Sequence, residues 1–269
     1  MANNSITNTI PTELGNLAQL VSFHDENNDL TGSLPSELGL LTGLTVLSTF
    51  NNHITSTIPT EFGNLSQLSL FGIFTNYITG SIPSELGRLI NLTNLDITEN
   101  QLTSTIPTEL GNLAQLVYFF AYDNDLTGSL PSELGLLTRL TVLSTYSNHI
   151  NSTIPTELGS LALLPEFSAF TNNMTGPIPS ELGRLTSLTF LVMASNSITR
   201  TIPTELGNLA QLLYFAAFDN NLTGSLLPEL GHLTQLFFLA TGTNHLSSKL
   251  LQIMRGYRNC CFLMYTQMP

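Results

Sequence analysis

Histidine and carboxylate side chains recur at fixed intervals in this sequence, and these residue types could hold a metal ion. His53, His149 and His245 follow one another at intervals of 96 residues. Three imidazoles bind zinc only if their nitrogens come within about 2 Å of one ion. The segment HDENND, His24 to Asp29, adds oxygen donors of the kind that calcium prefers. Whether either set can bind a metal depends on the elements that position it.

Glutamates form the most regular set of charged residues. They stand 24 residues apart, at Glu13, Glu37, Glu61, Glu85, Glu109, Glu133, Glu157, Glu181, Glu205 and Glu229. One interpretation is a stripe of carboxylates that binds cations. The other, which we favour, is that each Glu stabilises the N-terminus of a short helical turn and keeps the surface soluble.

No arrangement of residues in the sequence is typical of catalysis. The sequence contains no nucleophile paired with a base, no phosphate-binding loop and no metal cluster with credible spacing. We therefore expect a protein without enzymatic activity and without a cofactor.

A 24-residue period organises nearly the whole chain. Asparagine holds one position of every repeat, at Asn4, Asn28, Asn52, Asn76, Asn100, Asn124, Asn148, Asn172, Asn196, Asn220 and Asn244. Gly, Glu, Leu and, over most of the chain, Pro keep their own positions in the same register. A fixed period of this length is typical of solenoids, in which each repeat contacts mainly its neighbours.

One repeat, LAQLVYFFAYDNDLTGSLPSELGLL from Leu113 to Leu137, indicates the local elements. Val117 to Tyr122 is short and rich in β-branched and aromatic residues, which predicts a strand of a parallel sheet. Asn124 is expected to satisfy backbone groups where the chain leaves that strand. Gly128 is expected to permit a bend. The segment Pro131 to Gly135 predicts a single helical or 3-10 turn that its glycine ends.

This stacking argues against the metal sites. Equivalent positions four repeats apart would be separated by roughly 19 Å at the usual strand spacing, so the three histidines cannot share one zinc ion. The spacing within HDENND fits no calcium loop. A solvated edge is the interpretation we prefer for that segment, and no metal is expected.

Within the repeats the pattern LxxLxxLxLxxNxLxGxIPxxLGxL recurs, and it resembles the plant-type leucine-rich repeat over roughly residues 4 to 250. The resemblance implies an α/β, β-rich horseshoe solenoid with a concave parallel sheet and short convex turns or 3-10 helices, in about ten to eleven repeats. It also implies a role in binding proteins, peptides or glycans. We expect residues 1–251 to form the solenoid. Residues 252–269, which include Cys260 and Cys261, would form a non-repeat tail or cap, with a membrane-leaning or lipid-modified tail as the alternative.

Alternation along each strand separates core positions from surface positions. The first inward position alternates strictly between Phe and Leu, at Phe23, Leu47, Phe71, Leu95, Phe119, Leu143, Phe167, Leu191, Phe215 and Leu239. The second is often small: Ala121, Ala169 and Ala217 each follow a Phe, as though volume were conserved within a layer. Asp25 breaks this pattern. A buried unpaired carboxylate is costly, so we expect the first repeat to fray or to be covered.

Aromatic residues are concentrated at the outward positions of the strands. They are Phe50, Phe74, Tyr118, Phe120, Tyr122, Tyr146, Phe170, Phe190, Tyr214, Phe218 and Phe238. Solvent-facing aromatics at this density are typical of an interface. Cross-strand packing that only stabilises the sheet is one alternative, and self-association is another.

These features predict a non-enzymatic recognition module that binds a protein or peptide, or less readily a polysaccharide, through an aromatic concave face. One alternative is a structural scaffold subunit buried in a larger intracellular or organellar assembly. Another is the ectodomain fragment of a receptor kinase, which would need further sequence after Pro269.

Composition limits the partners and the location. The formal net charge of −12 repels phosphate backbones, so no nucleic-acid partner is expected. No apolar run approaches the length of a transmembrane helix, and the first residues lack the features of a secretory signal. A secreted or cell-surface location rests on the family resemblance and on six Asn-x-Ser/Thr sequons. An intracellular or organellar location is the alternative.

Overall fold

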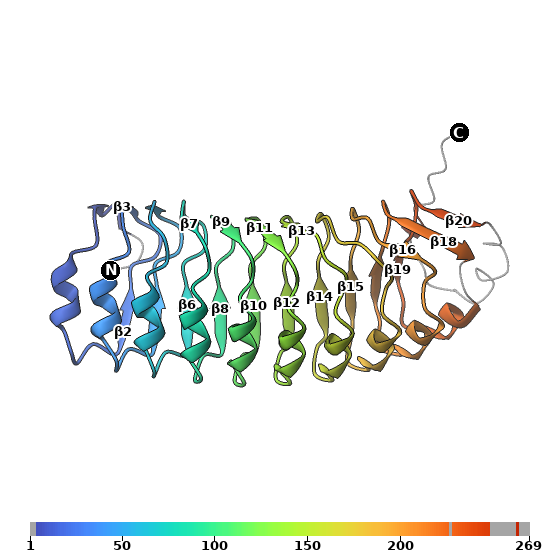
Figure 1. Ribbon diagram of the computed structural model, residues 1–269, viewed down its shortest axis with the longest axis horizontal. Helices are drawn as coiled ribbons and strands as arrows, with labels where there is room; N and C mark the ends of the chain where they lie inside the picture. Colours follow the sequence, from blue (N-terminus) through green and yellow to red (C-terminus); the bar gives the residue numbers. More distant parts are fainter. Residues whose placement is uncertain (1–3, 226–227, 248–261, 264–269) are drawn as a thin grey trace.

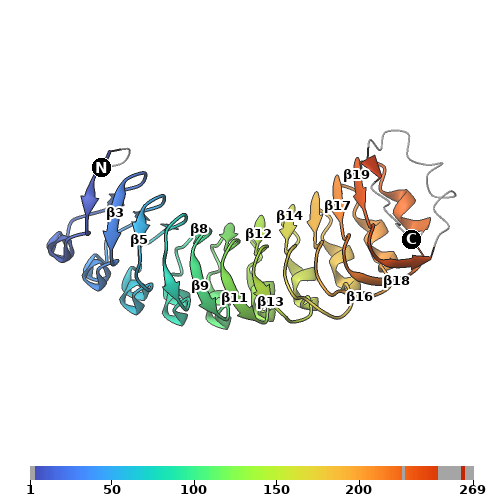
Figure 2. The ribbon, with the colours of Figure 1, turned by 90° about the horizontal axis from the view of Figure 1, so that it is seen from above.

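The repeats stack side by side into a single curved solenoid. The computed structural model describes residues 4–225, 228–247 and 262–263. Seen from above, the repeats form an arc with strands along its inner edge and short helices along its outer edge (Figure 2). Figure 1 looks at the helical side, with the strands behind it. The predicted β-rich solenoid is confirmed.

One parallel sheet of eleven strands lines the concave side. Its strands are β2 (Ser22–His24), β4 (Val46–Ser48), β6 (Leu70–Gly72), β8 (Asn94–Asp96), β10 (Tyr118–Phe120), β12 (Val142–Ser144), β14 (Glu166–Ser168), β15 (Phe190–Val192), β17 (Tyr214–Ala216), β19 (Phe238–Ala240) and β21 (Phe262–Leu263). Neighbouring strands pair with an offset equal to one repeat, as in Phe119 opposite Leu143. Equivalent residues of successive repeats therefore lie side by side across the sheet.

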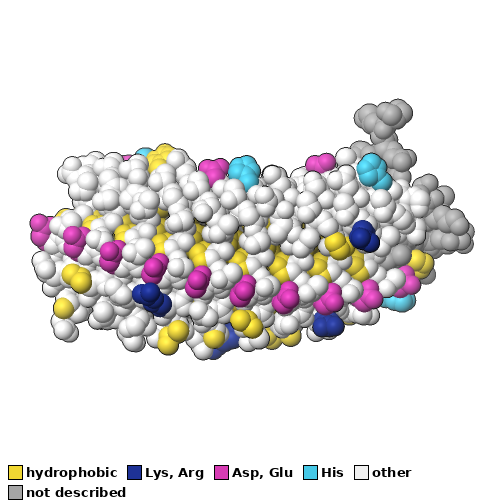
Figure 3. Space-filling view, in the orientation of Figure 1, with side chains coloured by type: hydrophobic (Ala, Val, Ile, Leu, Met, Phe, Trp, Pro, Cys, Tyr) yellow, Lys and Arg dark blue, Asp and Glu magenta, His cyan; other side chains and the backbone are white. Residues whose placement is uncertain are grey.

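The convex side is built from one 3-10 helix per repeat. The helices are η1 (Thr12–Asn16), η2 (Ser36–Leu40), η3 (Thr60–Asn64), η4 (Ser84–Arg88), η5 (Thr108–Asn112), η6 (Ser132–Leu136), η7 (Thr156–Ser160), η8 (Ser180–Arg184), η9 (Thr204–Asn208) and η10 (Pro228–His232). From η1 to η9 a proline precedes each helix, and each of the ten has a Glu in its first turn. The acidic side chains form a row along this face (Figure 3). The predicted helical turn is confirmed.

The glycine of each turn has a different role from the predicted one. Gly135 lies inside η6, which continues to Leu136, so the expectation that it ends the turn was wrong. A Cβ atom at Gly135 would lie 2.5 Å from the carbonyl oxygen of Glu157 in the next repeat. The glycine is needed because neighbouring 3-10 helices approach each other at this point.

Lateral strands join the concave and convex sides, and the sequence did not predict them. They are β1 (Thr7–Asn8), β3 (Asp29–Gly32), β5 (His53–Ile54), β7 (Thr79–Gly80), β9 (Gln101–Ser104), β11 (Asp125–Gly128), β13 (His149–Ile150), β16 (Thr199–Arg200), β18 (Asn221–Ser225) and β20 (His245–Ser247). They form three small parallel sheets. Gly128 ends β11 with φ of 71°, which confirms the bend predicted there.

The asparagine positions form a hydrogen-bonded ladder between repeats, as predicted. Asn124 donates from Nδ2 to the carbonyl of Ile97 at 3.0 Å, and its Oδ1 accepts from the backbone N–H of Leu102 at 2.9 Å. The same geometry recurs at the neighbouring Asn100 and Asn148. Each amide thus satisfies backbone groups that the sheet leaves without partners.

The core is one continuous hydrophobic layer between the sheet and the 3-10 helices. Every residue of the Phe and Leu alternation is buried in it, and so are Ala121, Ala169 and Ala217. The predicted inward positions are therefore confirmed.

Asp25 lies in this layer and has a partner. It is 5% exposed, and Asn28 donates from Nδ2 to Asp25 Oδ1 at 3.1 Å. Strand β2, immediately before it, pairs with β4 in the same register as the rest of the sheet. The expectation of a frayed strand at this point was wrong, because the neighbouring asparagine ladder supplies a hydrogen bond to the carboxylate.

Most of the segment 252–269, including Cys260 and Cys261, lies outside the described residues. Strand β21 pairs with β19 at Phe238 and Phe262, which keeps the offset of one repeat. Within the described part of the chain, no helix combines the length and the apolar character that crossing a bilayer requires.

Candidate binding surface on the concave face

Outward side chains of the concave strands form columns that run from repeat to repeat. The first column contains Tyr118, Phe190, Tyr214 and Phe238, at the first residue of their strands. The middle column contains Phe120, at the third residue of β10. The third column lies two residues after each strand and contains Phe50, Phe74, Tyr122, Tyr146, Phe170 and Phe218. The structure thus brings the eleven predicted aromatic residues together in neighbouring columns of one sheet.

Many of these rings stack on one another. In the third column, ring centroids are 4.2 Å apart for Phe50 and Phe74, and 4.3 Å apart for Tyr122 and Tyr146. The stack continues from Tyr146 to Phe170 at 4.2 Å. Aromatic cross-strand pairs each contribute roughly 0.2–1 kcal/mol. Part of the aromatic surface therefore stabilises the sheet, as the packing alternative requires.

Stacking removes these rings from water to different extents. Burial, followed by the charges of Tyr122 and Asp123, raises the pKa of Tyr146 well above its usual range. Burial also raises the pKa of Tyr214. Phe190 and Phe218, by contrast, are 37% and 39% exposed. Rings available for contact with a partner therefore include those of Phe190 in β15 and of Phe218 just after β17.

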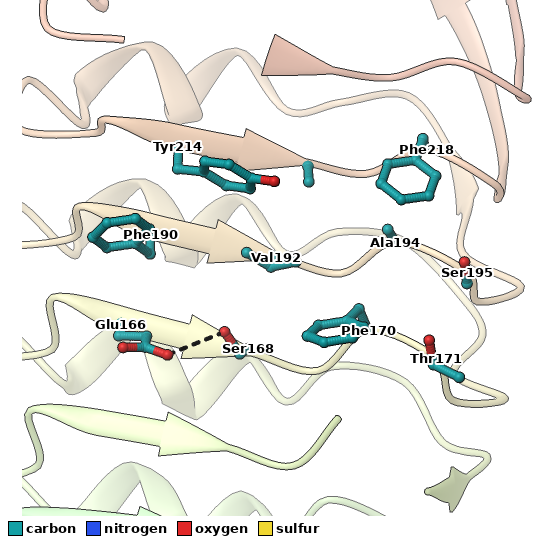
Figure 4. A pocket seen from close by; sticks show the side chains of 11 residues that line it. Glu166, Ser168, Phe170, Thr171, Phe190, Val192, Ala194, Ser195, Tyr214 and Phe218 are labelled. Carbon is teal, nitrogen blue, oxygen red and sulfur yellow. Dashed lines mark hydrogen bonds between the residues drawn. The ribbon is translucent and has the colours of Figure 1, made fainter. Parts of the chain in front are cut away.

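An open hollow of about 590 Å³ lies on β14, β15 and β17 (Figure 4). Its walls are the rings of Phe170, Phe190, Tyr214 and Phe218. The floor is made of small side chains from the middle and third columns, namely Ser168, Val192, Ala194 and Ala216, and Glu166, Thr171 and Ser195 complete the lining. Its volume falls in the range of roughly 300–1,000 Å³ that is typical of ligand pockets.

The hollow exists because both aromatic columns are interrupted there. Glu166 precedes Phe190 in the first column, and Ala194 stands between Phe170 and Phe218 in the third. Glu166 is half-buried, and Ser168 Oγ donates to its Oε1 at 3.4 Å. The sequence pattern predicted the aromatic walls but not these two residues. The signal that could have found them is the break that each makes in its own column.

Acidic groups add negative charge to the same face. Asp96, in the middle column of β8, accepts hydrogen bonds from the backbone N–H and the hydroxyl of Thr98. Burial raises the pKa of Asp96 although these hydrogen bonds oppose the shift. Glu99 and Asp123 lie exposed next to the third column. In the described part of the chain the concave strands contain no Lys or Arg.

The histidines form pairs with carboxylates rather than a shared site. His149 Nε2 lies 3.5 Å from Asp125 Oδ1, and His53 Nδ1 lies 3.9 Å from Asp29 Oδ1. Within HDENND, His24 Nδ1 lies 3.3 Å from Glu26 Oε1. Among the described residues, no three His, Cys, Asp or Glu side chains are grouped so that they could hold a metal ion.

Three solved structures, two of them of plant receptors, are similar to this chain. The plant peptide hormone receptor RGFR1, in complex with RGF2, is 36% identical with a TM-score of 0.89, over 90% of this chain and 39% of the receptor. PEPR1, in complex with AtPEP1, is 28% identical with a TM-score of 0.86, over 99% of this chain and 41% of the PEPR1 chain. The ectodomain of the Arabidopsis receptor kinase HAESA, with an extended IDA peptide hormone ligand, is 26% identical with a TM-score of 0.79, over 98% and 49%. This chain therefore spans less than half the length of each receptor chain.

The sequence pattern of the Leucine Rich Repeat family matches residues 43–65, 91–113 and 187–209. Each segment begins just before a concave strand and ends just after the next 3-10 helix. No curated protein sequence matches the chain. Its repeat spacing, concave parallel sheet, convex 3-10 helices and similarity to plant receptor ectodomains show that the chain belongs to the leucine-rich-repeat family and is of the plant type.

Proposed function

We propose that this chain is a recognition module that binds a protein or peptide through its aromatic concave face, without catalysing a reaction. The observation that carries the proposal is the aromatic-walled hollow on β14, β15 and β17, where exposed rings adjoin a floor of small side chains. Exposed aromatic side chains around a concave site are typical of interface hot spots.

The similar receptors support the same proposal. RGFR1, PEPR1 and HAESA were each solved in complex with a partner. RGFR1 is a peptide hormone receptor, and the HAESA ectodomain was solved with a peptide hormone ligand. The similarity covers 90% or more of this chain in each case. By analogy with these receptor ectodomains, we place the module outside the cell, either secreted or at the cell surface.

Some rings mainly hold repeats together in this proposal and others mainly contact a partner, whereas Phe170 does both. Tyr122, Tyr146 and Phe170 are stacked face to face and hold adjacent repeats together. Tyr118 and Phe190 are 38% and 37% exposed and are available to a partner. A variant that removes only exposed rings therefore tests binding with little effect on folding.

The test is a selection of short random peptides displayed on phage, with the purified 269-residue protein as the immobilised target. We expect enriched peptides to bind the wild-type protein and to lose most of their binding when Tyr118→Ser and Phe190→Ser are combined. The matched control is Leu40→Ser with Leu136→Ser, which removes two apolar residues, 65% and 64% exposed, from the convex side. Thermal denaturation confirms that both variants fold.

Two outcomes contradict the proposal. One is that no peptide is enriched. The other is that enriched peptides bind the concave variant as well as the wild-type protein, or that they lose binding only in the convex control.

A further inference from the structure

The third aromatic column is interrupted twice, at Thr98 and at Ala194, and the hollow lies at the second interruption. Where the column is continuous, adjacent rings have centroids 4.2–4.3 Å apart. Phe170 and Phe218 belong to repeats on either side of Ala194, because β15 pairs with both β14 and β17. At the usual strand spacing, equivalent positions two strands apart are separated by roughly 10 Å. That separation leaves room for one ring stacked on both neighbours.

The surfaces around this break are suited to an apolar side chain. Phe218 is 39% exposed, and Val192 lies half-buried on the floor. Ala194 itself is only 2% exposed and forms the bottom of the hollow. A side chain that enters here contacts rings at its sides and methyl groups beneath it, which favours an aromatic or large aliphatic group.

The charged groups around the hollow determine which residues are favoured next to that side chain in the ligand. Glu166 lies at its edge, and the hydroxyl of Ser168 uses only part of the four or so acceptor sites of a carboxylate. Asp219 is exposed, one residue after Phe218. The described arginines lie away from this sheet: Arg88 and Arg184 end η4 and η8, Arg139 follows η6, and Arg200 ends β16. Electrostatic complementarity therefore favours a cationic partner.

We infer that the hollow at Ala194 is a side-chain pocket for a cationic peptide, which inserts one aromatic or large aliphatic residue between Phe170 and Phe218 and places a neighbouring Lys or Arg against Glu166. This inference rests on the proposed function and specifies its ligand class. The aromatic residue supplies most of the affinity, and the basic residue supplies selectivity and a faster association rate.

The experiment uses the same displayed peptides and one variant that completes the column. Ala194→Phe places in the hollow the ring type that Phe170 and Phe218 already carry, so it is expected to fold. Peptides enriched on the wild-type protein should contain an aromatic or large aliphatic residue beside Lys or Arg. Their affinity for Ala194→Phe should fall by at least about tenfold, since a pocket contact of this size contributes roughly that factor.

A second variant tests the charge separately. Glu166→Gln keeps the shape of the side chain and removes its charge, and it should weaken the enriched cationic peptides by about threefold, as for a partly exposed ion pair. A synthetic copy of the best peptide with its basic residues replaced by Gln should bind the wild-type protein and Glu166→Gln equally. Glu109→Gln, at an exposed position in the first turn of η5 on the convex side, is the matched control and should leave binding unchanged.

The outcomes separate this inference from the function on which it rests. If no peptide is enriched, the proposed function is overturned, and the inference with it. If peptides are enriched but bind Ala194→Phe as tightly as the wild-type protein, or if acidic sequences are enriched, only the inference is overturned. If Ala194→Phe fails to fold, the Glu166→Gln comparison and the composition of the enriched peptides decide the question.

Discussion

Asn148 donates a hydrogen bond from its side-chain Nδ2 to the backbone carbonyl of Ala121, in the preceding repeat, at 3.0 Å. The same side chain accepts a hydrogen bond from the N–H of Leu126 at 2.9 Å, and it is 4% exposed. One amide therefore bonds to two backbone groups of the preceding repeat, one just after its concave strand β10 and one in its lateral strand β11.

Replacing this amide should be costly. In Asn148→Ala, the buried N–H of Leu126 loses its side-chain partner, and the carbonyl of Ala121 keeps only the longer hydrogen bond from Asn124 Nδ2, at 3.4 Å. We expect the free energy of unfolding to fall by about 2–4 kcal/mol, because each unsatisfied group costs roughly 1–3 kcal/mol. Urea denaturation measures the change. Asn151→Ala, at an exposed position of the same repeat, is the control, and an equal loss in both variants would contradict the prediction.

Gly135→Ala tests the close approach of neighbouring 3-10 helices. The added methyl group would lie 2.5 Å from the carbonyl oxygen of Glu157, so the backbone of one helix must move. Overpacking of this kind costs about 1–3 kcal/mol. Gly43→Ala, whose Cβ would have no heavy atom within 4 Å, is the matched control. The prediction fails if denaturation midpoints show that the two variants are equally stable.

Thr145→Val should stabilise the protein. The hydroxyl of Thr145 is buried and has no hydrogen-bond partner in the described part of the chain, and the same holds for Thr49 at the equivalent position of an earlier repeat. Val has nearly the same shape without the polar atom. We expect the free energy of unfolding to rise by about 1 kcal/mol, and Thr49→Val to give a similar gain. A lower free energy of unfolding in both variants would contradict this prediction.

Asp25 should make stability depend on pH. Burial raises the pKa of this carboxyl above its ordinary 3.8, and the charge of Glu26 adds to the shift. The folded protein therefore holds the proton more tightly than the unfolded chain. The contribution of Asp25 to stability is greatest below pH 3.8 and is lost as pH rises through its folded pKa.

Asp25→Asn tests this dependence, because Asn keeps an oxygen that can accept the hydrogen bond from Asn28. We expect the variant to be more stable than the wild-type protein at neutral pH, with the difference shrinking toward acid. Urea denaturation at a series of pH values measures it. Asp219→Asn, at an exposed position, should show no such trend. A wild-type protein that is the more stable of the two at neutral pH would rule out the assignment.

The repeated residues predicted most of the architecture, because each is needed at every turn of the solenoid. The asparagines have to satisfy backbone groups between repeats, and the inward Phe and Leu residues have to fill the core. Both requirements recur at every repeat, which makes them visible in a single sequence.

Features that depend on how two repeats meet were harder to predict. The lateral strands are only two to five residues long, which is too short for an alternation of polar and apolar residues to mark them. Gly135 was interpreted through its own turn, whereas the constraint comes from Glu157 in the next repeat. Asp25 was treated as unpaired because the side chain of Asn28 could not be placed without coordinates.

The candidate site was predicted only in part, because a repeat pattern shows what the repeats share and not where they differ. Every aromatic wall of the hollow stands in the repeat pattern as a large outward residue. The hollow itself arises from Glu166 and Ala194, which depart from that pattern. The common repeat pattern does not show such departures, although they are the positions at which one repeat differs in shape from the next.

The alternation of Phe and Leu in the core limits how the gene can change in length. Loss of a single repeat would place two phenylalanine rings on adjacent strands, such as those of Phe119 and Phe167, where each ring now packs beside a leucine, and the core would have to repack. Loss or gain of two repeats preserves the order of the layers. Unequal recombination should therefore be tolerated in steps of 48 residues, and relatives of this protein should differ in length by pairs of repeats.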